Sequence, residues 1–120
     1  MFFRARRYIV AEGKADAFTA FFLQRLLPVE ERYGGRLVGR WQTEDESEVL
    51  ALWAYQSQEA ASQCAKAVSE DPAWREATSF RERYLDPLYL EEAESDLYST
   101  VPLRSTLLAP FAGEARPTAS

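Results

Sequence analysis

The chain has 120 residues, 47% of them hydrophobic, and a formal net charge of −5, from 14 Lys and Arg against 19 Asp and Glu. This length and composition are typical of one compact globular domain and exclude a disordered or low-complexity class. The sequence contains no histidine. That absence excludes a histidine base, a histidine-ligated metal and a Ser-His or Cys-His catalytic pair.

We predict a single domain over residues 1–108 and a loosely ordered or partner-docked tail over residues 109–120, which are rich in Ala, Pro and small polar residues. The single cysteine, Cys64, excludes an intrachain disulfide and indicates a reducing compartment. It shares a helical stripe with Ala61 and Val68, so we predict a buried structural thiol.

Membrane, nucleic-acid, metal and cofactor partners are not expected. No signal peptide and no run of 18 apolar residues is visible, so we predict a cytoplasmic protein without membrane insertion. The chain is acidic, and its arginines are spread over two predicted strands and a helix. Nucleic-acid binding requires a concentrated basic surface, which this pattern lacks.

A change in the spacing of the apolar residues separates a first strand from a first helix. Residues 4–11 contain adjacent Tyr, Ile and Val and end at Glu12-Gly13, which predicts a strand. Apolar residues then recur every three or four positions as far as Tyr33, which predicts an amphipathic helix. Pro28 lies inside this helix and predicts a kink or break, and Gly34-Gly35 ends it.

A β-hairpin follows, with strands over residues 37–43 and 48–55 joined by a polar turn at 44–47. If the hairpin is symmetric about this turn, positions whose numbers sum to 91 lie opposite each other.

The second half of the chain begins with a helix over residues 58–70, capped by Ser57. Asp71-Pro72 predicts the start of another helix, which runs to about Tyr84 and stops at Asp86-Pro87. Residues 97–103 contain β-formers and are predicted to form the last strand, and the acidic run 91–94 is predicted to be a solvated face or turn.

The predicted order is β-α-β-β-α-β with an extra helical segment before the last strand. This order predicts an α+β, ferredoxin-like fold, in which helices cover one face of an antiparallel sheet.

Alternation along the hairpin divides its residues between the two sheet faces. We predict that the helices cover the more apolar set: Leu37, Gly39, Trp41, Leu50, Leu52 and Ala54. The opposite, open face would then carry Val38, Arg40, Gln42, Val49, Ala51, Trp53 and Tyr55, with Arg6, Tyr8 and Val10 of the first strand. A bulge would invert part of a strand and change this division.

Six residues of this set are candidate ligand-binding residues: Arg6, Tyr8, Arg40, Gln42, Trp53 and Tyr55. Aromatic walls with a few polar groups are typical of a small-molecule pocket, and a large aromatic patch is also typical of a dimer interface, so both interpretations stay open. The candidates for catalysis are Tyr8 and Tyr55 for proton transfer and Arg6 or Arg40 for stabilising an enolate oxygen. A tyrosine with a pKa near 10 is a poor base unless a cation lowers that pKa.

Four segments stand in the order and spacing of a known family, over about residues 4–103. They read RRYIVAEGK, LPVEERYGGRLVGRW, LWAY and SEDPAW. In these segments the chain resembles the NIPSNAP-like family of dimeric α/β-barrel proteins. The resemblance implies a ferredoxin-like subunit and a homodimer that joins two sheets through their open faces into a shared barrel. The matching positions are Arg6 and Tyr8, Gly39 and Trp41, Trp53 and Tyr55, and Asp71, Pro72 and Trp74.

The chain departs from the family pattern at three places. A His that often precedes the strand Trp by two residues is Ala51 here, an Arg at the start of the next helix is Ala61, and the hairpin Gly and Asn are replaced by acidic residues at 46–48. Loss of the His argues against chemistry that relies on it.

Three functions stay open. The first is a homodimer that binds a small organic ligand in the barrel. The second is a cofactor-independent monooxygenase or isomerase that acts on an aromatic or polyketide-like substrate. The third is a structural or interaction protein with a filled barrel. Cavity volume distinguishes the first two functions from the third.

Overall fold

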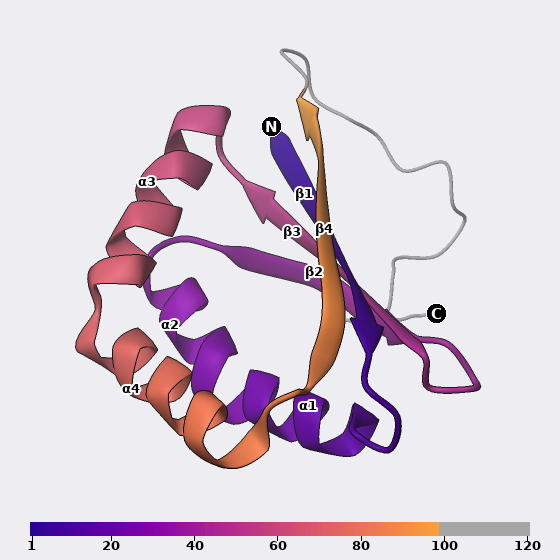
Figure 1. Ribbon diagram of the computed structural model, residues 1–120. Coiled ribbons are helices and arrows are strands. Elements are labelled where there is room, and N and C mark those ends of the chain that lie inside the picture. Colours follow the sequence, from indigo (N-terminus) through magenta and orange to yellow (C-terminus); the bar gives the residue numbers. More distant parts are fainter. Residues whose placement is uncertain (99–120) are drawn as a thin grey trace.

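The computed structural model describes residues 1–98 (Figure 1). Its elements, in chain order, are β1 (Phe2–Val10), α1 (Ala15–Phe21), the π-helical turn η1 (Phe22–Leu26), α2 (Leu27–Arg32), β2 (Arg36–Gln42), β3 (Glu48–Tyr55), α3 (Gln58–Glu70), α4 (Pro72–Phe80), the π-helical turn η2 (Arg81–Leu85) and β4 (Tyr89–Tyr98).

The four strands form one sheet in the order β2-β3-β1-β4, and every neighbouring pair is antiparallel. All the helices lie on one side of this sheet, and no helix of residues 1–98 covers its other side (Figure 1). The strand and helix order is that of the ferredoxin-like α+β fold, as predicted, with α4 and η2 as the extra helical segment before the last strand.

The predicted register of the β2–β3 hairpin is confirmed over its turn-proximal half. Arg40 pairs with Ala51 and Trp41 with Leu50, so these numbers sum to 91. Beyond this half a β-bulge at Val38 shifts the register, and Leu37 pairs with Trp53. The bulge turns Leu37 toward the helices, where it packs against the core.

Pro28 marks the predicted break in the first long helix. The five residues before α2 form the π-helical turn η1, and Pro28 then occupies the first turn of α2. A proline has no backbone N–H to donate to the preceding turn, so the helix changes its hydrogen-bonding pattern just before it. The helix ends at Gly34, whose φ of 97° is accessible to glycine at little cost.

Both predicted helix caps are present. The Ser57 hydroxyl accepts a hydrogen bond from the backbone N–H of Ala60, at 3.0 Å. The Asp71 carboxylate accepts one from the N–H of Ala73 at 2.7 Å, and it also accepts from the Tyr33 hydroxyl at 2.6 Å. Asp71 therefore caps α4 and joins it to the end of α2.

The last described strand differs from the prediction. β4 covers residues 89–98 and includes the acidic run that we predicted to be a solvated face or turn. Its carboxylates are exposed, but two of them pair with arginines of β1: Arg6 with Glu94 and Arg4 with Asp96. These cross-strand ion pairs allow a sequence poor in β-formers to extend the sheet. Residues 99–103 of the predicted strand lie outside the described residues.

The prediction of which sheet face the helices cover is wrong. Val49, Ala51, Trp53 and Tyr55 are buried beneath the helices, whereas Trp41 and Leu50 of the other face are each 41% exposed. Apart from Leu37, which the bulge places with the buried set, the residues were divided correctly between the two faces, but each set was assigned to the wrong side of the sheet. Hydrophobicity alone favours the predicted arrangement, with the more apolar set beneath the helices. It takes no account of the polar partners that the helices supply to Arg6 and Arg40.

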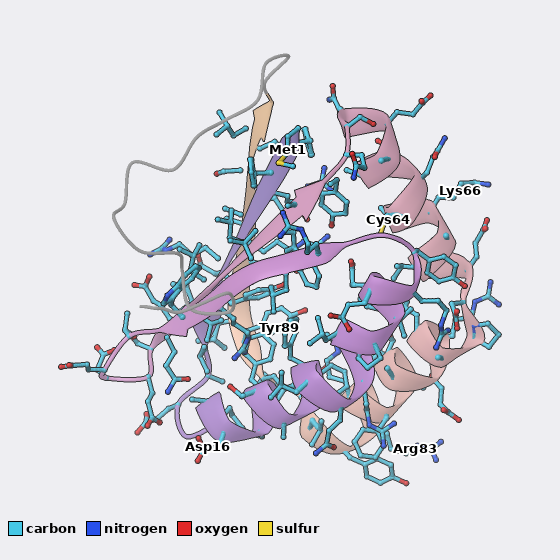
Figure 2. The ribbon with its side chains drawn as sticks, turned by 180° about the vertical axis from the view of Figure 1, so that it is seen from behind. Met1, Asp16, Cys64, Lys66, Arg83 and Tyr89 are labelled. Atoms are coloured by element: carbon cyan, nitrogen blue, oxygen red, sulfur yellow. The ribbon has the colours of Figure 1, made fainter. Side chains whose placement is uncertain are left out.

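The core lies between sheet and helices. Its largest fully buried side chains are Trp53, Phe2, Leu88, Val49 and Cys64. The thiol of Cys64 is buried, as predicted, 3.9 Å from the backbone oxygen of Glu30. Figure 2 shows Cys64 on the inner side of α3 and Lys66 pointing away from the sheet.

Candidate functional site

A cavity of about 250 Å³ lies between the helices and the β1, β3 and β4 strands. Its wall is largely aromatic, formed by Tyr8, Phe18, Phe21, Phe22, Trp53, Trp74 and Tyr89. Figure 2 shows Tyr89 in the layer between the sheet and the helices. The charged groups of the wall are Arg6, Glu30, Arg81, Glu92 and Glu94. An apolar wall with a few charged groups is the usual composition of a ligand site.

Arg6 and Glu30 form the buried charge pair of this cavity. Arg6 Nη1 lies 3.5 Å from Glu30 Oε1, and Arg6 Nε donates to Glu94 Oε2 at 3.0 Å. Burial raises the pKa of the Glu30 carboxyl, and Arg6 offsets part of that rise. Burial is the largest single influence on Arg6 and disfavours its charge, but Glu30, together with Tyr8, Tyr55 and Glu94, outweighs it, so the pKa of Arg6 is raised and the guanidinium stays charged. The Arg6 guanidinium also lies 5.9 Å from the centre of the Trp53 ring.

The Tyr8 ring forms part of the aromatic wall. It makes edge contacts with Phe18 and Tyr89, each with ring centres 5.0 Å apart. Burial raises the pKa of the Tyr8 phenol, and the nearby Glu92 carboxylate raises it further. The Tyr55 phenol has its pKa raised to about 12, chiefly by burial. Neither tyrosine has the lowered pKa that a general base would need, although a neutral phenol can still donate a hydrogen bond.

The structure brings three of the six candidate residues to this cavity: Arg6, Tyr8 and Trp53. Tyr55 is buried in the adjoining core, beside Phe2. Arg40 and Gln42 line a separate, open groove beside α1. This cavity therefore lies beneath the helices, whereas we predicted the ligand-binding residues to lie on the open face of the sheet.

Arg40 is held by neutral groups. Its Nη1 donates to the Thr19 hydroxyl at 2.8 Å, and its guanidinium lies about 5 Å from the ring centres of Phe18 and Phe22. Burial lowers the pKa of Arg40, and no ion pair joins it to a carboxylate of residues 1–98.

Sequence reasoning missed several cavity residues, and Glu30 is the most important. The sequence does indicate that Glu30 is buried, because it lies four residues after Leu26 and so continues the apolar stripe of the first helix. A carboxylate on a buried helical stripe needs a buried partner. Trp74 was named only as a position that matches the family, and Tyr89 and Glu94 lie in a part of β4 that was not predicted to be a strand.

Residues 1–98 contain no group of three or more Cys, Asp or Glu side chains placed to hold a metal ion. None of their helices has the length and apolar character needed to cross a membrane.

Comparison with solved structures identifies the fold. A NIPSNAP family protein of unknown function from Agrobacterium tumefaciens superposes with a TM-score of 0.70 and 22% identity, over 87% of this chain and 94% of that one. An uncharacterised NIPSNAP domain protein from Burkholderia xenovorans superposes with a TM-score of 0.71 and 21% identity, over 88% of this chain and 100% of that one. A putative antibiotic biosynthesis monooxygenase from Nitrosomonas europaea superposes with a TM-score of 0.61 and 14% identity, over 84% of this chain and 100% of that one. At these identities the likeness shows the fold alone, which is the ferredoxin-like α+β fold.

The family follows from the sequence itself. The NIPSNAP family model matches residues 3–103. The chain therefore belongs to the NIPSNAP family. A search of curated proteins finds no match.

Proposed function

We propose that this NIPSNAP protein binds a small organic ligand in the cavity between its sheet and its helices. The supporting observation is the cavity of about 250 Å³ itself, with aromatic walls and the buried Arg6–Glu30 pair. A protein with a purely structural role has no need to keep such a space open, since filling it would stabilise the fold.

The test blocks the entrance of the cavity. Ala65 on α3 is exposed and lines the cavity, so Ala65→Trp places an indole at its mouth. Gln63→Trp is the matched control, because Gln63 is also exposed on α3 and does not line the cavity. Small aromatic compounds should shift the NMR signals of cavity residues in the wild type and in the control, and bind at least about tenfold more weakly to Ala65→Trp. Equal binding to both variants would contradict the proposal.

The homodimer is the second part of the proposal. The open face of the sheet carries Trp41 and Leu50, each 41% exposed, and Leu97, which is 58% exposed. The half-buried Phe3 and Leu52 share this face. An apolar surface of this kind is typical of an interface, and a second copy would present the same surface for a symmetric contact.

Sedimentation tests the dimer. Leu50→Glu puts a charge on the open face, whereas Leu23→Glu puts one at a similarly exposed position on η1. We expect a dimer for the wild type and for Leu23→Glu, and a monomer for Leu50→Glu. A wild-type monomer at micromolar concentration would refute the interface.

Catalysis is the alternative, as a cofactor-independent monooxygenase or isomerase of aromatic substrates. Its support is the likeness in fold to the putative antibiotic biosynthesis monooxygenase and the presence of Tyr8 beside Arg6 in the cavity. The raised phenol pKa of Tyr8 makes that residue a poor base, so we place binding first. Oxygen uptake with quinol-type substrates that is lost in Tyr8→Phe would favour the alternative.

A cytoplasmic location completes the proposal. The chain has one cysteine, and its thiol is buried within a helix–sheet core that needs no disulfide. Such cysteine use is typical of reducing compartments. Fractionation of the native host, with detection of the protein by antibody, tests this location.

A further inference from the structure

The Glu30 carboxylate presents one oxygen that residues 1–98 leave without a hydrogen bond. Oε1 faces Arg6, whereas Oε2 is buried and accepts from no group of the described chain. Glu30 is only 4% exposed and lines the cavity. A buried acceptor without a donor is costly, so a molecule in the cavity that carries a donor gains from meeting it.

The charge around Arg6 disfavours an anion. Its guanidinium is shared between the carboxylates of Glu30 and Glu94, which leaves this group of three with a net charge of −1. Glu92 adds another carboxylate to the wall, and Arg81 offsets it. From the sequence, Arg6 or Arg40 was a candidate for stabilising an enolate oxygen, but the positive charge of Arg6 is already neutralised by the protein.

The walls of the cavity favour a flat ring. Trp53 and Phe22 meet at an angle of 66° with ring centres 6.0 Å apart, and Tyr8 meets Phe18 at 77°. Rings that meet edge to face leave flat faces against which another aromatic ring can pack.

We propose that the cavity selects neutral or cationic aromatic molecules that donate a hydrogen bond to the Glu30 carboxylate, such as phenols and arylamines, and rejects aromatic carboxylates. This inference rests on the proposed ligand-binding function and specifies the chemical class of its ligand.

Four probes that share a tolyl group test the inference on the full chain: 4-methylphenol, 4-methylaniline, toluene and 4-methylbenzoate. Their affinities are measured by NMR titration of the cavity residues. A hydrogen bond to a charged acceptor should make 4-methylphenol bind at least about tenfold more tightly than toluene, and 4-methylbenzoate should bind more weakly than either. 4-Methylaniline should behave as the phenol does.

The variant Glu30→Gln removes the charge while it keeps the size of the side chain. We expect the preference for 4-methylphenol over toluene to fall below about threefold, with toluene binding unchanged. Glu91→Gln is the control, since Glu91 is an exposed carboxylate of the same strand as Glu94 and does not line the cavity.

The outcomes separate the two proposals. If no probe shifts a cavity signal in the wild type, the ligand-binding function fails. If the probes bind, but 4-methylbenzoate binds as tightly as 4-methylphenol or more tightly, the ligand-binding function stands and the donor preference is overturned. The same conclusion follows if toluene binds as tightly as 4-methylphenol. The wild-type panel decides the preference even if Glu30→Gln does not fold.

Discussion

Replacing Arg6 by methionine is the sharpest test of the buried pair. The change removes the cation that faces Glu30, a residue that is 4% exposed. At 3.5 Å, and with an effective dielectric constant of about 20, the attraction between the two charges is about 5 kcal/mol. Breaking such a buried pair by removing one partner costs about 3–5 kcal/mol, because the remaining charge has neither water nor a partner. We expect Arg6→Met to lower the free energy of unfolding by about 3 kcal/mol.

The reverse substitution should cost less. In Glu30→Gln the guanidinium of Arg6 keeps its hydrogen bond to Glu94, so we expect a loss of about 1 kcal/mol. In the double variant Arg6→Met with Glu30→Leu neither charge is left buried, and its stability should lie within about 1 kcal/mol of the wild type.

The assay is urea denaturation at pH 7 and at one fixed protein concentration, followed by tryptophan fluorescence. The control is Arg7→Met on the same strand. Arg7 lies 2.7 Å from Glu48, but both side chains are exposed, so its loss should cost no more than about 1 kcal/mol. If Arg6→Met costs no more than Arg7→Met, the Glu30 carboxylate is hydrated and the reasoning about a buried pair is wrong.

The pH dependence gives the same test a second readout. Burial raises the folded-state pKa of Glu30, so the folded protein takes up a proton more readily than the unfolded chain, and this group adds stability as the pH falls. Without Arg6 the pKa rises further. The deficit of Arg6→Met should therefore shrink as the pH is lowered from 7 toward 5, and a constant deficit would contradict the assignment.

Three further predictions concern the scaffold. Leu88→Ala, at a side chain with 0% exposure, should cost about 3 kcal/mol in urea denaturation, and Leu90→Ala, at 65% exposure, less than about 0.5 kcal/mol; similar losses would be inconsistent with the described core. Gly39→Ala places a methyl group 2.4 Å from the Trp41 ring, so the indole must move; an unchanged Trp41 NMR signal, assigned with Trp41→Phe, would refute this contact. Asp71→Asn should lower the thermal midpoint at pH 7. Hydrogen bonds hold the pKa of the Asp71 carboxyl low, so its stabilisation is present above the unfolded pKa and lost as the pH falls through the folded one; the difference from the wild type should vanish in acid.

The predictable part of the fold is the part that local rules govern. Ser57 and Asp71 indicate where α3 and α4 begin, because a helix cap is a contact between near neighbours in sequence. Pairs such as Arg40 with Ala51 follow from a short turn. The strand over residues 89–98 was missed because its stability depends on arginines more than 80 residues away, which no local pattern reveals.

Three of the six candidate residues line the cavity, and they lie on the side of the sheet opposite to the one predicted. Alternation grouped Arg6, Tyr8 and Trp53 correctly, since β-strands fix the side of each residue relative to its neighbours. Which side the helices cover depends on Glu30 and Thr19, the partners that make buried arginines tolerable. Those contacts join distant segments, so the choice of side could not be read from the hairpin.

Strand β1 carries two separate sets of residues. Its even-numbered positions, such as Arg6 and Tyr8, face the cavity side, and its odd-numbered positions, such as Phe3 and Arg7, face the open side. Substitutions at even-numbered positions therefore change the cavity wall, and substitutions at odd-numbered positions change the outer surface, each without altering the other. A single inserted or deleted residue would exchange the two sets along the rest of the strand. Strand β1 should therefore vary in composition among relatives far more readily than in length.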